Sequence, residues 1–336
     1  MDFLILKKRL SGQYFLILLV IISLILAYVS TFQFYSAQGI DYFDSNQYIR
    51  HKNIMEGVAG NPWQYRVLTV PINQIAIKIG YKLGLPYHIA YAFIFVRFII
   101  DAAIYFLAFF YYRKLGVYQN LAIIGILLLA WGISYSWYDS DISTNTFFEV
   151  VFYLLTGLAI LYKKWFWVPI IIFFAALNRE TSGLIPFIFI SAVWFAFPKE
   201  LRRKGLSIFW VAIAIYVLTF FGLRVLFGKQ ELLIPHGQSP GLELLIFNIG
   251  RLITWDRLLI TLSLIPLVAL FGYQKWPIVL RCFFWVIVPS WFFVHAFVAV
   301  LAETRLFIVP LALVFIPGAL FFASPPKEPN TTVLLV

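Results

Sequence analysis

Ten runs of predominantly apolar residues dominate this chain and limit what it can fold into. A helix needs roughly 20 residues to cross the hydrocarbon core of a bilayer, and most of these runs approach or exceed that length. The pattern predicts an all-α fold, a polytopic transmembrane helical bundle of about ten spans. The candidate spans are residues 13–33, 87–112, 119–137, 146–162, 165–177, 183–197, 205–227, 258–273, 276–300 and 305–323.

Composition supports a membrane protein and excludes several soluble classes. Hydrophobic residues make up 62% of the chain and charged residues 12%, whereas a soluble domain has about 25% charged residues. The formal net charge is +11, but the basic residues form short clusters between the apolar runs, as the positive-inside rule expects. No Lys/Arg-rich domain could follow a phosphate backbone, so nucleic acid is not an expected partner. The single cysteine, Cys282, allows no intramolecular disulfide.

The topology depends on residues 66–83, the one ambiguous segment. Its polar residues recur every three to five positions, which predicts an amphipathic helix on the membrane surface with Arg66 in its first turn. If that helix does not cross, every basic cluster lies on the cytoplasmic side together with both termini. Residues 1–323 then form a single transmembrane domain, in which residues 34–86 hold the first outer loop and the surface helix. Residues 324–336 would be a short disordered cytoplasmic tail.

The first outer loop carries two carboxylates, Asp41 and Asp44. They are three residues apart, so on a helix they would share a face. One could then act as a general base on an acceptor hydroxyl, while the other tunes it or binds a metal ion. Two other interpretations stay open. The aspartates could cap helices at a loop, or the loop could be an ordinary solvated segment with an aromatic belt at the membrane interface.

Two further polar motifs are predicted on the same side of the membrane. Residues 178–181 join two apolar runs that are short for a full crossing, and ionisable residues at membrane depth are usually functional. A guanidinium fork matches a phosphate group, so Arg179 is a candidate phosphate ligand. Alternatively, Arg179 and Glu180 pair with each other and close a helical hairpin. Arg305, close to Glu303 at the start of the last run, is a second candidate phosphate ligand or else an interface anchor.

This arrangement resembles the GT-C superfamily of integral membrane glycosyltransferases. The matching stretch reads DYFDSNQYI from Asp41 and YRVLTVP from Tyr65, and it is similar to motifs of bacterial members and of the related GPI mannosyltransferases. The resemblance implies a polyprenyl-phosphate-linked sugar donor, a lipid or glycan acceptor, and a catalytic carboxylate in the first outer loop. It implies that the reaction takes place at the outer face of a bacterial cytoplasmic (inner) membrane, in the modification of cell-envelope glycans or glycolipids.

The resulting candidate site has Asp41 and Asp44 as catalytic residues and a larger set of substrate-binding residues. Membrane lipids are the other expected partners. No definite cofactor is implied, and a divalent metal ion stays open. His51 has no metal-ligand spacing, so a plain surface position is the alternative for it. The candidate substrate contacts are His51, Tyr65, Arg66, Arg179, Glu180, Glu303 and Arg305.

Two other functions stay open. A transporter or lipid flippase would use membrane-embedded arginines and carboxylates as a substrate path. Against it, the chain has no recognisable internal repeat of the kind that many transporters carry, and its polar motifs crowd on one face. A non-catalytic assembly subunit would use the acidic loop to bind a partner, and it predicts no cavity beneath that loop.

Overall fold

The structure, a computed structural model, describes residues 2–138 and 144–325. Within these ranges the chain is helical and forms no β-strand, which confirms the all-α prediction. Five helices are long and apolar enough to cross a membrane, and the pair α12–α13, bent by 65°, would make a sixth. These helices mark a membrane protein, while a total of ten spans stays a prediction.

Each apolar run predicted from the sequence contains a helix. The long ones are α1 (Asp2–Gln38), α5 (His88–Leu115), α10 (Arg202–Phe227), α14 (Ile278–Val298) and the segment Thr304–Ala323, which includes α15 (Ile308–Pro310) and α16 (Ile316–Ala323). The shorter ones are α6 (Gln119–Tyr135), α7 (Asn145–Leu161), α8 (Trp167–Asn178) and α9 (Ile185–Ala196). After α11 (Leu242–Gly250), the run expected at 258–273 is divided between α12 (Leu252–Leu262) and α13 (Ile265–Phe271). The break falls at Ser263, whose φ of 52° is incompatible with a continuous helix.

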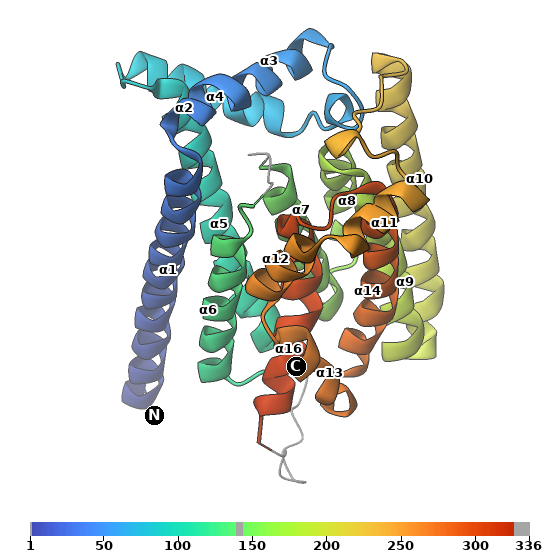
Figure 1. The fold of residues 1–336 in the computed structure, drawn as a ribbon. Coiled ribbons are helices and arrows are strands. Elements are labelled where there is room, and N and C mark those ends of the chain that lie inside the picture. The colour runs from blue at the N-terminus through green and yellow to red at the C-terminus, as the bar shows by residue number, and fades with distance from the viewer. Residues whose placement is uncertain (1, 139–143, 326–336) are drawn as a thin grey trace.

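A layer of short helices lies across one end of the bundle (Figure 1). We call this layer the cap. Gly39 separates it from α1 and Gly57 ends its third helix, and both glycines adopt a positive φ that other residues rarely accept. The cap consists of α2 (Ile40–Tyr42), the π-helical turn η1 (Phe43–Gln47), α3 (Tyr48–Glu56), the 3-10 turn η2 (Trp63–Tyr65) and α4 (Thr69–Lys82).

The predicted surface helix corresponds to α4. Asn73 and Ile77 are buried, whereas Ile75 and Lys78 are exposed. Figure 1 shows α4 lying across the end of the bundle rather than along the long helices. Its position at a membrane surface stays a prediction. Arg66 does not lie in the first turn of this helix as expected, because it precedes α4 and ends η2.

The basic clusters at the C-terminal ends of α5 and α7 and before α14 lie at the end of the bundle opposite the cap (Figure 1). Arg113 lies in the last turn of α5, and Lys163 follows the end of α7. Lys275 Nζ donates to the carbonyl of Phe322 in the last turn of α16, at 3.0 Å. Figure 1 shows α1 beginning and α16 ending at that end. A one-sided distribution of this kind is typical of the cytoplasmic face, and which side faces the cytoplasm stays a prediction.

A buried cluster of polar and charged side chains holds α1 against α5. Arg97 Nε lies 2.8 Å from each carboxylate oxygen of Asp101. The hydroxyls of Ser30 and Thr31 on α1 donate to Asp101 Oδ2 at 3.2 and 3.4 Å, and Tyr105 donates to Ser30 at 3.0 Å. We call these five residues the α1–α5 cluster. All five are buried, so their hydrogen bonds replace contacts that lipid could not supply.

Hydrogen bonds tie the cap to the loop that follows α10. The backbone N–H of Asn61 donates to the carbonyl of Glu231 at 2.8 Å, and the N–H of Leu233 donates to the carbonyl of Asn61 at 3.0 Å. The hydroxyl of Tyr65 donates to the carbonyl of Gly228 at 2.8 Å. The cap is therefore fixed on one side by its continuity with α1 and on the other side by this loop.

The last long segment forms the centre of the bundle. Every residue from Thr304 to Phe321 is buried. Close helix contact depends on small residues: at Gly132 in α6, a Cβ atom would lie 2.5 Å from Leu311. Of the predicted disordered tail, residues 326–336 lie outside the described residues.

Candidate functional site

Three arginines and three carboxylates pair at the capped end of the bundle. The residues come from the end of η2, from α7, from the turn η3 (Glu180–Leu184) with the residue before it, and from the turn η7 (Thr304–Phe307) with the residue before it. We call these six residues the ionic network. Its pairs are Arg66 Nη2 with Glu180 Oε2 at 2.9 Å, Arg179 Nη1 with Glu149 Oε2 at 3.0 Å, and Arg305 Nη2 with Glu303 Oε2 at 2.7 Å.

The ionic network meets the first turn of α7. The hydroxyl oxygen of Thr146 accepts hydrogen bonds from Arg179 Nη1 and Arg305 Nη1, each at 2.9 Å. Two guanidinium groups therefore point at one neutral oxygen, at a helix end that already carries partial positive charge. The hydroxyl of Thr144 and Nε of Arg179 are buried without a hydrogen-bond partner among the described residues. Open donors around a helix N-terminus suit an anion such as phosphate.

Further hydrogen bonds fix the segments that carry the network. Asn145 Nδ2 donates to Asn178 Oδ1 at 3.1 Å, and Asn178 Nδ2 donates to the carbonyl of Asn145 at 2.8 Å. Tyr153 donates to the carbonyl of Thr181 at 2.7 Å, and the hydroxyl of Thr181 donates in turn to Glu149. The start of α7 is therefore held against the end of α8, and α7 against η3, by hydrogen bonds in addition to the ion pairs.

The network contains five of the predicted substrate contacts, but their pairing differs from the alternative considered for residues 178–181. Arg179 and Glu180 do not pair with each other to close a hairpin. Arg179 pairs with Glu149, and Glu180 pairs with Arg66. Glu149 was missed by sequence reasoning, although a carboxylate within an apolar run is itself a signal of a functional or paired position.

Asp41 and Asp44 lie at another part of the capped end. Asp41 is exposed, and its carboxylate makes no hydrogen bond or ion pair with a described residue. Asp44 Oδ1 accepts a hydrogen bond from the backbone N–H of Ala90, in the first turn of α5, at 3.3 Å. Asp44 therefore satisfies one of the open donors at the start of a helix, which fits the capping interpretation. No hydrogen bond or ion pair among the described residues joins either aspartate to the ionic network.

The two remaining candidate contacts, His51 and Tyr65, are buried within the fold. His51 is 3% exposed, so the alternative of a surface position is wrong. Its Nε2 lies 3.0 Å from Gln74 Oε1 and joins α3 to α4. Burial lowers the pKa of His51, although the bond to Gln74 acts in the opposite sense. Tyr65 is bonded to the carbonyl of Gly228, and the Arg224 guanidinium lies 4.4 Å from its ring centroid.

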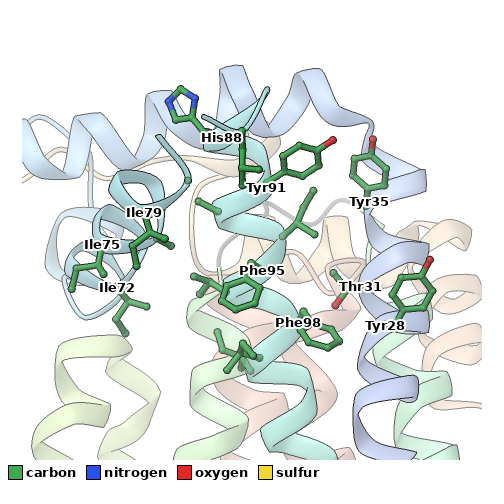
Figure 2. Close-up of a pocket in the computed structure, with 18 of the residues that line it drawn as sticks. Tyr28, Thr31, Tyr35, Ile72, Ile75, Ile79, His88, Tyr91, Phe95 and Phe98 are labelled. Atoms are coloured by element: carbon green, nitrogen blue, oxygen red, sulfur yellow. The ribbon is translucent and has the colours of Figure 1, made fainter. Parts of the chain in front are cut away.

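A large apolar groove opens between α1, α4 and α5 (Figure 2). Its volume is about 1020 Å³, and nearly all of its lining atoms are apolar. Figure 2 shows His88 and Tyr91 near the cap and Phe95 and Phe98 farther along α5. Ala90, which bonds to Asp44, lies between His88 and Tyr91 in the sequence, so the first outer loop adjoins the cap end of the groove.

Helix α7 stands between the groove and the ionic network. Phe148 and Val151 line the groove, whereas Thr146 and Glu149 bond to the arginines. The first turn of α7 is therefore flanked by an apolar surface on one side and by guanidinium groups on the other. Thr31 also lines the groove, so the α1–α5 cluster reaches its wall.

Within residues 2–138 and 144–325, no three His, Cys, Asp or Glu side chains come together as a metal-binding group, and a role for a divalent metal ion stays open. Comparisons with protein-family profiles, with curated proteins and with solved structures gave no significant match. Function is therefore inferred from the groove, the ionic network and the first outer loop.

Proposed function

We propose that the protein is a membrane glycosyltransferase that takes a sugar from a polyprenyl-phosphate-linked donor on the extracytoplasmic face of the membrane. The observation that carries this proposal is the apolar groove, whose lining residues His88 and Tyr91 flank Ala90, the residue that bonds to Asp44. A prenyl chain is long, flexible and wholly apolar, and a groove formed by three apolar helices would remove much of its surface from lipid and water. The donor's head group would then reach the capped end.

We assign the donor's phosphate to the first turn of α7. Arg179 and Arg305 would supply charged donors there, and Thr144 an open hydroxyl. Arginine–phosphate hydrogen bonds are roughly twice as strong as neutral ones. Glu149 and Glu303 hold the two guanidinium groups in place. Their negative charge also repels a phosphate, so phosphate binding would loosen at least one of these two ion pairs. Asp41 or Asp44 would act as the general base on the hydroxyl of a lipid or glycan acceptor.

Filling the groove is expected to weaken donor binding. Ala103 lines the groove on α5, and Ala103→Trp would place a bulky ring where the prenyl chain lies. We expect the KM for the lipid-linked donor to rise about tenfold, equivalent to about 1.4 kcal/mol, in sugar-transfer assays on purified protein in nanodiscs. Ile124→Trp, at an exposed position on α6 outside the groove, is the control. An unchanged KM in Ala103→Trp would show that the chain binds elsewhere, and a wild-type protein that transfers no sugar would remove the enzyme proposal.

The topology can be tested with two single-cysteine variants. Lys82→Cys at the end of α4 and Lys114→Cys at the end of α5, in a Cys282→Ser background, lie at opposite ends of the described bundle. We expect an impermeant thiol reagent to label position 82 from outside whole cells and position 114 only after the cytoplasmic face is opened. Labelling of position 82 from the cytoplasm alone would invert the topology and move the proposed site inside.

A lipid flippase is the second candidate, and the α1–α5 cluster favours it. Arg97 and Asp101 are ionisable, buried within a long apolar helix and adjoin the groove through Thr31, and such residues often line substrate paths. Reconstitution in vesicles separates the two functions. A flippase would move a labelled prenyl phosphate between leaflets without sugar transfer, whereas the proposed enzyme would transfer sugar without moving the carrier.

A further inference from the structure

His295, near the end of α14, has a defined pattern of hydrogen donors and acceptors. Its Nδ1 lies 2.8 Å from the carbonyl oxygen of Trp291. A carbonyl oxygen can only accept, so Nδ1 carries the hydrogen, and in the neutral ring Nε2 then carries a lone pair. No described residue forms a hydrogen bond with Nε2. The side chain is only 3% exposed, so this open acceptor lies inside the protein.

The charged groups near His295 are Arg179, Arg66 and Arg305, all members of the ionic network. The imidazole therefore stands close to the guanidinium groups to which we assign the phosphate.

Packing against two aromatic rings fixes the position of the imidazole. The Trp291 ring stacks on His295 with centroids 5.0 Å apart and an interplanar angle of 25°. Trp291 is itself anchored, because its Nε1 donates to the carbonyl of Leu306 at 2.7 Å. Phe307 packs near the imidazole with a centroid distance of 6.2 Å. The imidazole is thus held beside the turn that supplies Arg305.

We infer that Nε2 of His295 accepts a hydrogen bond from a hydroxyl of the ligand whose phosphate binds at Arg179 and Arg305. Arginine side chains only donate hydrogen bonds. They can hold phosphate oxygens, but they cannot accept from a sugar hydroxyl. A hydrogen-bond acceptor near the arginines can bind a sugar hydroxyl, while the arginines bind the phosphate. This inference rests on the proposed function and adds a residue that makes the site selective for a sugar phosphate over phosphate alone.

The test compares two soluble probes, glucose 1-phosphate and inorganic phosphate, on the full-length protein in detergent. We expect the wild type to bind glucose 1-phosphate about tenfold more tightly, since an unpaired buried acceptor disfavours the ligand that lacks the hydroxyl. His295→Leu removes the acceptor and is expected to abolish this preference while leaving phosphate affinity within about twofold. His295→Gln places an amide oxygen near the position of Nε2 and is expected to keep most of it. Melting temperatures of the variants report whether they fold.

The outcomes separate the inference from the proposed function. A wild-type protein that binds neither probe would remove the phosphate site, and the inference with it. A wild type that binds both probes equally, or a His295→Leu variant that keeps the preference, would overturn only the role of His295. A folded His295→Gln variant as unselective as His295→Leu would also overturn it, because ring packing rather than an acceptor atom would then explain the loss.

Discussion

Asp101→Ala is expected to destabilise the folded protein by about 3–5 kcal/mol, because it leaves the Arg97 guanidinium buried without its counter-charge. Asp101 is fully buried, and both of its carboxylate oxygens contact Arg97 Nε at 2.8 Å. The loss should appear as a large fall in melting temperature and in the yield of monodisperse protein in detergent. Asp256→Ala, at a side chain that is 50% exposed, is the control and should change stability by less than about 0.5 kcal/mol.

A double variant identifies the cause of that loss. Replacing a buried ion pair by apolar side chains of similar size is often neutral or stabilising. Arg97→Met combined with Asp101→Leu should therefore recover most of the stability that Asp101→Ala loses. If the double variant is as unstable as the single one, the loss comes from the hydrogen bonds of Ser30 and Thr31 to Asp101, which join α1 to α5, and not from the ion pair within α5.

Asp41→Asn is expected to lower the rate of sugar transfer by about 10²–10⁴-fold, the usual effect of removing a general base. The carboxylate of Asp41 is exposed and makes no contact that would restrain it. Asp44 already bonds to the backbone of Ala90, and asparagine keeps a capping oxygen. Asp44→Asn is therefore the matched comparison, with an expected loss below about tenfold. Both variants should melt as the wild type does.

The measurement is the initial rate of transfer from a polyprenyl-phosphate sugar in nanodiscs, at saturating donor. A larger loss in Asp44→Asn than in Asp41→Asn would exchange the roles of the two aspartates. Full activity in both variants would remove the first outer loop from catalysis and leave the ionic network as the place to look for a base.

Topology reasoning from the sequence predicted which loops share one end of the bundle. Arg66, Arg179 and Arg305 were expected on one side because the apolar runs alternate in direction between them, and the structure brings all three into the ionic network. Their partners could not be predicted, because pairing depends on how each helix is rotated about its own axis. Hydropathy carries no information on that rotation in helices that are apolar all round.

Charged residues inside the apolar runs were the main ones that the sequence-based prediction of the site left out. Arg97, Asp101 and Glu149 were absorbed into candidate spans, where each counted as a minor interruption. A charge within a span is expensive unless it is paired, so each one implied a partner. Arg97 and Asp101 pair with each other within α5, and Glu149 pairs with Arg179 from another segment. The burial of His51 was also unpredictable from local sequence, because it depends on α3 folding back against α4.

The cap is fixed on one side by α1 and on the other by the hydrogen bonds between Asn61 and the loop after α10. The groove lies between α1, α4 and α5. In the proposed topology the groove faces lipid, and a molecule that enters through it arrives by diffusion in two dimensions within the bilayer. Its occupancy follows its mole fraction among the membrane lipids and not its concentration in the surrounding water. Dilution with inert phospholipid empties such a site, whereas dilution of the vesicle suspension with buffer leaves it filled.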